Sequence, residues 1–584
     1  MTVLPVLHKI GALSLICVVS TGLGQQSPSS VPAPEVAQAT GVTISSRTEL
    51  VTVPVVVTDK KGKHLSGLKQ SDFTIEEDGQ KREIATFQEI VTSDSAKKPI
   101  SPPAFPLSNF ASSDQEGRLV TILVVDLLNT PFMYQENARE QLLKFLNAHL
   151  NGSGPTSLTV ITSRGLRLVH SFTTDPAILI EAMKRIESNT AWRDQAAPGQ
   201  LSDLSSTNAF DQSLGENPSP SQLAHAEAAA LRQIISEKAD ADYAYYRQRD
   251  ATVITLSALE QLAQSSAGIP GRKSLLWITG GLPFVLSDPN SLTGIDTSLM
   301  SNYQRTWQAL NDANISVYPI DAHGLVPRTV EMQSKQPTAS RNNPGFQTPS
   351  RASRPSRPSF QIPTEQNSQD SLRNFAQATG GEACYNRNDL NECVAIAGQD
   401  SSQYYMLAYY LPADDRKPGW RKLKVHVAAA HREIRARNAF YVGEAKADDP
   451  HSIEQQFELA FSSPLDYTAV PLGLKFTGVT PADNGNRKLG FSVFLQPNGF
   501  ATEDNWIKLN VHFVATDAKN KSILVFSKMF KAHLKPEGVK DLVENGFSYN
   551  GEITLSPGRY QLKLLVRDDL DGKFGSIESP FLVN

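Results

Sequence analysis

The stretch RLVTILVVDLLNT, residues 118–130, decides the fold. From Leu119 to Val125 its residues are apolar almost without a break and do not alternate with polar ones. A strand of this kind has both faces covered, which is typical of a parallel sheet packed between helices. Asp126 follows where the strand is expected to end. We therefore expect an α/β unit to begin near Arg118.

Strands and helices alternate after this stretch, which predicts an open sheet with helices on both faces. Helices are expected over 134–150, 176–186, 222–264, 303–312, 371–379 and 390–397, and strands over 158–162, 273–279, 315–321 and around 382–385. Two polar, Pro- and Ser-bearing insertions, 196–221 and 327–367, predict solvated loops. The predicted fold class is α/β, with a central doubly wound, Rossmann-like unit over 118–400.

Blocks rich in β-strand patterns flank this unit. Residues 43–91 contain Val-rich strands and a turn at 77–79, which predict a small antiparallel β domain. A Pro- and Ser-rich linker is expected over 92–117. Short strands over 401–445 predict a β extension, and alternating apolar and polar residues over 454–584 predict a β-sandwich.

The N-terminus has the three-part pattern of a secretory signal peptide. His8 and Lys9 precede an apolar run from Ile10 to Val19, and small residues lead to Gly24. The run is shorter than the roughly 20 residues that a membrane-spanning helix needs. We expect residues 1–24 to be removed, leaving a disordered lead-in over 25–42 and no transmembrane segment. The mature chain is then periplasmic, on the cell surface or extracellular.

Charge and cysteine usage limit the partners and the redox state. The net charge of −4 gives no basic surface for nucleic acid, so a protein partner is expected, with a glycan or a small molecule as alternatives. Signal cleavage leaves two of the three cysteines, Cys384 and Cys393. In an oxidising compartment they are expected to form a short-loop disulfide, and the alternative is two separate buried thiols.

Several stretches, in this order, resemble the von Willebrand factor type A-like domain with flanking β domains of VWFA-related proteins of the acidobacterial type. They are VPVVVTDKKGKHLSGLKQSDFTIEEDGQ (53–80), LVTILVVDLLNTPF (119–132), GRKSLLWITGGLPF (271–284), NISVYPIDAHGL (314–325), FAQATGGEACYNRNDL (375–390) and DSSQYYMLAYYLP (400–412). The resemblance spans roughly residues 43–442. It implies a binding role for the central unit.

The resemblance also implies a metal-ion-dependent adhesion site at the carboxyl edge of the sheet. Such sites use an Asp-x-Ser-x-Ser motif, a Thr and a second Asp, because a hard cation needs about six oxygen ligands. Asp126 matches the first Asp, Thr130 the second Ser and Thr190 the Thr. Leu128 and Gly280 stand where the first Ser and the second Asp belong, and neither side chain offers oxygen.

A degenerate site is therefore expected, with at most weak binding of a divalent cation and no cofactor. Asp126 is expected to cap the following helix or bond a neighbouring turn. The alternative is a remodelled site on the binding face that uses Asn129 or Asp321.

Motifs of common enzymes are absent from the sequence. It has no His-Glu-x-x-His, no Gly-x-Ser-x-Gly and no phosphate-binding Gly-rich loop that ends in Lys-Ser/Thr. We therefore predict an exported binding, adhesion or scaffold protein rather than an enzyme. The alternative is an exported enzyme accessory or hydrolase whose catalytic residues lie in irregular loops.

Overall fold

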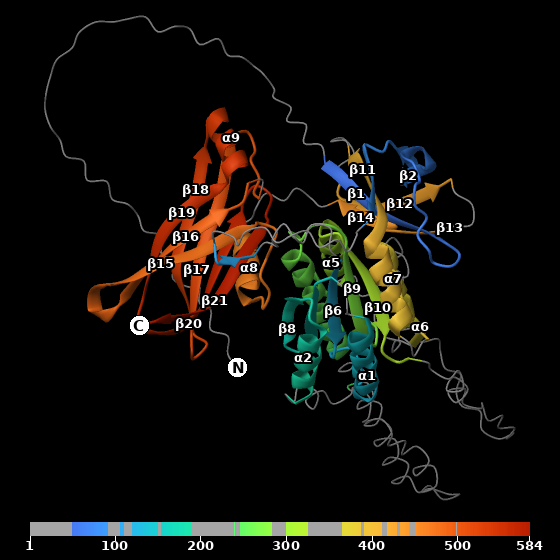
Figure 1. Ribbon diagram of the computed structural model, residues 1–584, viewed down its shortest axis with the longest axis horizontal. Helices are drawn as coiled ribbons and strands as arrows, with labels where there is room; N and C mark the ends of the chain where they lie inside the picture. The colour runs from blue at the N-terminus through green and yellow to red at the C-terminus, as the bar shows by residue number, and fades with distance from the viewer. Residues whose placement is uncertain are drawn as a thin grey trace, which may run out of the picture.

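The computed structural model describes residues 49–91, 105–109, 119–149, 154–188, 239, 246–282, 299–324, 365–386, 390–411, 417–428, 432–442, 450–497 and 499–584. These residues form five sheets in three units (Figure 1). The expected signal peptide, the lead-in and the insertions 196–221 and 327–367 lie outside the described residues.

The predicted fold class, α/β with a central doubly wound, Rossmann-like von Willebrand factor type A-like domain, is wrong for this chain. Strand is the commoner state of the described residues, and four of the five sheets are antiparallel throughout. Parallel pairs occur in one of these five sheets, and its edge strand is antiparallel. The prediction took the fold class from the unit over 118–400, although β-rich flanking segments were expected, and those flanking segments build the other four sheets. The chain is mainly β.

The mixed sheet has five strands in the order β10-β9-β6-β7-β8. Its centre is the stretch that opened the sequence analysis, and every neighbouring pair is parallel except β7 with β8. The strands are β6 (Val120–Asp126), β7 (Thr156–Thr162), β8 (Gly165–Thr173), β9 (Lys273–Thr279) and β10 (Ile315–Asp321).

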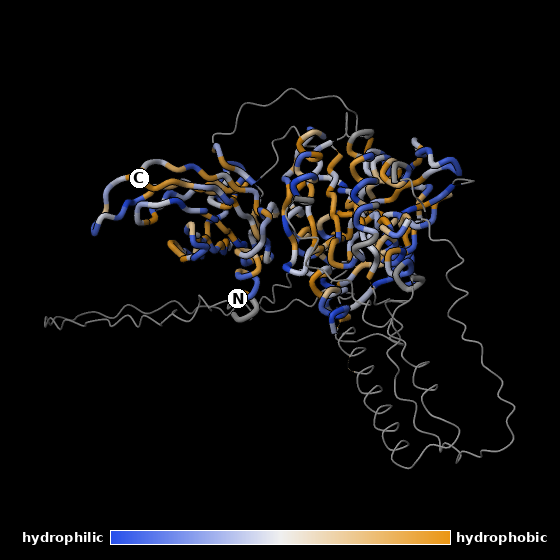
Figure 2. The backbone as a smooth tube through the Cα atoms, turned by 90° about the horizontal axis from the view of Figure 1, so that it is seen from below, coloured by the Kyte–Doolittle hydropathy of each residue, from blue (hydrophilic) through white to orange (hydrophobic). Residues whose placement is uncertain are grey.

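Helices cover both faces of the mixed sheet, since alternate residues of β6 enter two separate cores. Ile122 and Val124 pack on one face with residues 246–265, which are helical, and with α5 (Met300–Asp312) and α6 (Glu365–Thr379). Leu123 and Val125 pack on the other face with α1 (Phe132–His149), α2 (Pro176–Ser188) and α7 (Leu390–Ser402). In Figure 2, apolar segments run through the middle of this unit, with hydrophilic segments towards its outside.

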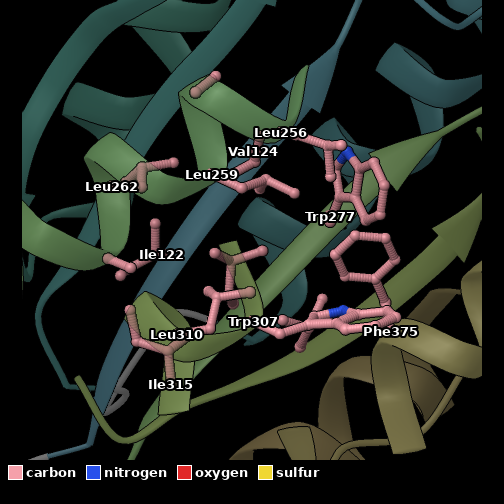
Figure 3. Close-up of a cluster of buried hydrophobic side chains, with 14 of the residues drawn as sticks. Ile122, Val124, Leu256, Leu259, Leu262, Trp277, Trp307, Leu310, Ile315 and Phe375 are labelled. Carbon is pink, nitrogen blue, oxygen red and sulfur yellow. The ribbon is translucent and has the colours of Figure 1, made fainter. Parts of the chain in front are cut away.

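Aromatic rings fill the first of these cores, as Figure 3 shows. The ring of Phe375 lies 5.3 Å from that of Trp277 and 5.6 Å from that of Trp307. All three side chains are at most 2% exposed. These contacts join α5 and α6 to β9.

An N-terminal β-sandwich is built from two segments that are far apart in the sequence. Its sheets have the orders β13-β1-β11-β4 and β14-β12-β2-β3, and one apolar core lies between them. The strands are β1 (Glu49–Asp59), β2 (Phe73–Glu77), β3 (Gln80–Arg82), β4 (Thr86–Val91), β11 (Gln403–Leu411), β12 (Gly419–Val427), β13 (Arg432–Ala436) and β14 (Ala439–Val442), with a 3-10 turn, η1, at Gln70–Asp72. The mixed-sheet unit is thus inserted within this sandwich.

A C-terminal β-sandwich has the sheet orders β19-β16-β15-β5 and β18-β17-β20-β21 around a second apolar core. The strands are β5 (Leu107–Ser108), β15 (Leu472–Pro481), β16 (Arg487–Leu495), β17 (Trp506–Asp517), β18 (Ser522–His533), β19 (Phe547–Leu555), β20 (Gly558–Asp568) and β21 (Phe574–Val583). Helices α8 (Pro450–Ser462) and α9 (Pro536–Asn545) and a 3-10 turn, η6, at Asp483–Gly485 complete it. The short β5 comes from the segment expected as a linker.

A tight contact joins this sandwich to the mixed-sheet unit. Leu465 packs into the core around Trp307, and the Thr468 N–H donates to the Ser265 carbonyl at 3.1 Å. The Gly268 N–H donates to Thr468 Oγ1 at 3.0 Å. A Cβ at Gly268 would lie 1.7 Å from the Thr468 carbonyl oxygen, so this approach requires glycine.

Candidate functional site

The carboxyl ends of β6, β9 and β10 meet at one edge of the mixed sheet, and each strand ends on a polar residue. These residues are Asp126, Thr279 and Asp321, and all three are buried. Ligand sites in sheets with parallel strands usually lie at this edge. The bonds that these side chains make decide whether the edge can bind or react.

The Asp126 carboxylate is fully buried and accepts four hydrogen bonds. Its Oδ1 accepts the N–H groups of Leu128 at 3.1 Å and Asn129 at 3.0 Å. Its Oδ2 accepts Asn129 Nδ2 at 2.8 Å and Thr279 Oγ1 at 2.9 Å. Burial raises the pKa of Asp126, and the bonds from Asn129 and Thr279 oppose that rise. The carboxylate therefore holds the turn after β6 against the end of β9.

Thr130 and Asn129 extend this arrangement to neighbouring segments. Thr130 Oγ1 donates to the Asp126 carbonyl at 2.5 Å and accepts the Gly280 N–H at 3.0 Å. Asn129 Nδ2 also donates to Thr255 Oγ1 at 2.7 Å. A Cβ at Gly280 would lie 2.5 Å from the Asn129 carbonyl oxygen, so there is no room for a carboxylate side chain at that position.

Asp321 bonds to a histidine at the same edge. Its Oδ1 lies 2.6 Å from His323 Nδ1 and accepts the His323 N–H at 3.0 Å. The ring of Tyr134 lies edge-on to the imidazole, at 4.5 Å between centroids. A Cβ at Gly280 would lie 3.3 Å from His323 Cε1, which places the imidazole beside the turn that follows β9.

The residues present do not fit a divalent cation. All the acceptor positions of the Asp126 carboxylate are used, Leu128 supplies no side-chain oxygen and Gly280 has no side chain. Thr190, the expected Thr ligand, lies outside the described residues. Within the described part of the chain, no three His, Cys, Asp or Glu side chains are grouped so that they could hold a metal ion.

Cys384 and Cys393 form a disulfide with their Cα atoms 6.1 Å apart. The Cys384 N–H donates to the Pro319 carbonyl, and the Asp321 N–H donates to the Cys384 carbonyl, both at 2.8 Å. Cys393 lies in α7 and is fully buried. The bond thus fastens α7 to the segment beside β10 and braces the chain next to Asp321.

A groove that the sequence analysis did not predict lies between β8 and α2. It has a volume of about 570 Å³, and its walls include Arg167, His170, Ile178, Glu181 and Arg185. Within the described residues β8 pairs with β7 alone, so its other side is a sheet edge. Figure 1 shows β8 and α2 next to each other at one side of the mixed sheet. The turn at Ser163–Arg164, followed by Gly165 with a positive φ, was the available sequence signal for β8.

Comparisons with known proteins show no family. No family model and no curated protein matches the chain. The putative ApaA protein from Bordetella pertussis is 15% identical over 19% of this chain and 91% of its own length, with a TM-score of 0.13. The pilus adhesin SpaC from Lactobacillus rhamnosus GG is 8% identical over 79% of this chain and 53% of its own length, with a TM-score of 0.25. Likenesses this weak support no conclusion about function. Among the described helices, none has the length and apolar character needed to cross a membrane.

Proposed function

We propose that this chain is an exported binding or scaffold protein, and that the edge of β8 with the groove beside it is a binding surface. The groove is the observation that supports the proposal, because it combines a sheet edge, exposed apolar side chains and charge in one place. Export is inferred from the pattern of residues 1–24.

The carboxyl edge of the mixed sheet supports the same proposal. Asp126, Thr130 and Thr279 bond to one another and to the backbone, so their hydrogen-bonding capacity stabilises the edge. Side chains occupied in this way position turns and strands rather than a substrate. The chain has three units, two of which meet at the tight contact at Gly268, and this organisation suits a protein that presents surfaces to partners.

A second candidate function rests on the Asp321–His323 pair. A carboxylate on Nδ1 fixes the imidazole so that Nε2 is left as a base, as in many hydrolases. This observation favours the hydrolase alternative. Among the described residues, Tyr134 is the hydroxyl-bearing side chain in ring contact with the imidazole, and the two rings are T-shaped.

The binding proposal is tested by filling the groove. Ala177→Trp places a large side chain in the groove from an exposed helix position. The matched control, Ser163→Trp, adds the same side chain at an exposed turn residue that does not line the groove. Full-length wild-type and variant proteins are cross-linked in situ and their partners are quantified by mass spectrometry. We expect Ala177→Trp to lose a partner that wild type and Ser163→Trp retain.

The outcome that refutes binding is specific. No partner above background for wild type, together with turnover of an ester or glycoside substrate that His323→Ala abolishes, would favour the second candidate.

A further inference from the structure

We propose that the groove between β8 and α2 binds an extended peptide segment of a partner protein, which adds to β8 as an extra strand and sets an acidic side chain against Arg167. This inference rests on the proposed function, since it names the chemistry of the partner at the same surface.

The backbone of β8 supplies the first argument. β8 is nine residues long and lies at the end of the sheet order, with β7 as its one neighbour among the described strands. An edge strand presents unpaired N–H and C=O groups, and an extended chain that pairs with them gains main-chain hydrogen bonds. The pairing with β7 shifts register near Leu158, which matches the mixed exposure along β8.

The walls of the groove supply the second argument. Ile178 on α2 lines the groove and is 41% exposed. Val169 on β8 packs partly into the core and also lines the groove. A strand laid along β8 would direct alternate side chains towards α2, where these apolar surfaces lie. The volume of about 570 Å³ accommodates several such side chains.

The charges of the groove determine which peptide fits. Glu181 is paired with Lys184 at 3.0 Å, so its negative charge is offset on α2 itself. Arg167 is exposed, and none of the described residues bonds its guanidinium. Arg185 adds a second positive charge, and His170 bonds the Ser171 carbonyl through Nδ1 at 2.7 Å. The surface therefore favours a carboxylate.

The same charges argue against a second copy of this chain as the occupant. Two β8 strands paired edge to edge would bring the basic side chains of both copies, Arg167 above all, to one interface. Like charges in neighbouring strands destabilise the pair. An acidic segment of a different protein meets the surface without that repulsion.

The test uses two short synthetic peptides as probes. The first is acetyl-Thr-Val-Glu-Val-Thr-Val-Thr-amide, and the second has Lys in place of Glu. Binding to the full-length protein is measured by fluorescence anisotropy at low and high salt. We expect the Glu peptide to bind at least ~10-fold more tightly than the Lys peptide, a ratio that corresponds to ~1.4 kcal/mol. Salt should reduce the difference.

Charge reversal supplies the decisive variant. Arg167→Glu should exchange the preference, so that the Lys peptide binds more tightly than the Glu peptide. The matched control is Arg164→Glu, which reverses an exposed arginine in the same hairpin that does not line the groove. It should keep the wild-type preference. Circular dichroism of both variants verifies that the hairpin remains folded.

Each further outcome separates this inference from the proposed function. Equal binding of both peptides, or a preference that Arg164→Glu changes as much as Arg167→Glu, overturns the inference. If the cross-linked partner of wild type persists with Arg167→Glu, binding stands and the groove is not its site. If wild type has no cross-linked partner and neither peptide binds, both proposals fail. A concentration-dependent dimer that Arg167→Glu changes would identify a second copy as the occupant and overturn the inference.

Discussion

Replacing Asp126 with alanine tests the role assigned to the carboxyl edge of the mixed sheet. The change removes the acceptor of four donors: the part-buried N–H groups of Leu128 and Asn129, the part-buried Asn129 Nδ2 and the buried Thr279 Oγ1. A hydrogen bond to a charged group contributes about 1.5–3 kcal/mol, and an unsatisfied buried donor costs about 1–3 kcal/mol. Removing the buried carboxylate also removes its desolvation cost, which offsets part of this loss of stability. We expect a net loss of about 3–5 kcal/mol.

The assay must report on the mixed-sheet unit itself, because a chain of three units need not unfold in one step. Hydrogen exchange followed by mass spectrometry gives the opening free energy of peptides from β6 and β9. The control is Asp370→Ala, which removes an exposed carboxylate paired with Arg373 at 2.7 Å and should cost less than about 1 kcal/mol. Asp126→Asn keeps one acceptor oxygen, so its loss of stability should lie between those of Asp126→Ala and Asp370→Ala.

Two results would refute the structural role of Asp126. The first is a loss below about 1 kcal/mol for Asp126→Ala, no larger than that of the surface control. The second is stabilisation of wild type by millimolar magnesium or manganese that disappears in Asp126→Ala, because an ion that binds the folded state raises its stability. The second result would restore the metal site that the four hydrogen bonds argue against.

Three further predictions concern buried side chains. Burial lowers the pKa of Lys273 to about 7, so the unfolded chain binds more protons than the folded chain between pH 7 and 10.5, and stability should rise with pH in that window by up to ~5 kcal/mol. Urea titrations of Lys273→Met should lack this rise, and a rise equal to that of wild type would contradict the assignment. Burial raises the pKa of Asp568 to about 6, so stability should fall by ~3 kcal/mol as pH increases from about 4 to 6, and Asp568→Asn should lose that dependence. Phe375→Ala removes a ring that packs on Trp277 and Trp307, and it should lower the free energy of unfolding by about 3–5 kcal/mol in denaturant titrations. A loss below about 1 kcal/mol would mean that the rings are loosely packed.

Local apolar patterns predicted the buried strands well. The strands expected over 273–279 and 315–321 are observed as β9 and β10 with those bounds. Both are buried along their whole length, so an unbroken apolar run identifies them. The helix expected over 176–186 is observed as α2, two residues longer.

The pairing of distant strands could not be predicted in the same way. Val53 pairs with Leu407 across more than three hundred residues, and no local pattern links the two segments. The sequence therefore suggested two separate small β regions where the structure has one sandwich. The fold class was incorrect because it was taken from the central unit, whereas the strands of the two sandwiches outnumber those of the mixed sheet.

The edge site was predictable in its position but not in its bonds. Asp126 was expected at the strand end because a charged residue follows an apolar run. The sequence could not predict that Asn129 bonds Asp126, or that Asp321 bonds His323 instead of a cation. These bonds depend on how separate loops meet. The groove was missed because β8 is half exposed and mixes polar with apolar residues, a pattern that is also typical of loops.

Recognition of an extended segment at a sheet edge is tested most directly by hydrogen exchange of residues 165–173 with and without the Glu peptide. The account predicts slower exchange of the backbone amides that face away from β7, together with slower exchange in α2, and no change in β18 at the edge of the C-terminal sandwich. Unchanged exchange in β8 while the peptide is bound, or protection confined to another sheet, would contradict it.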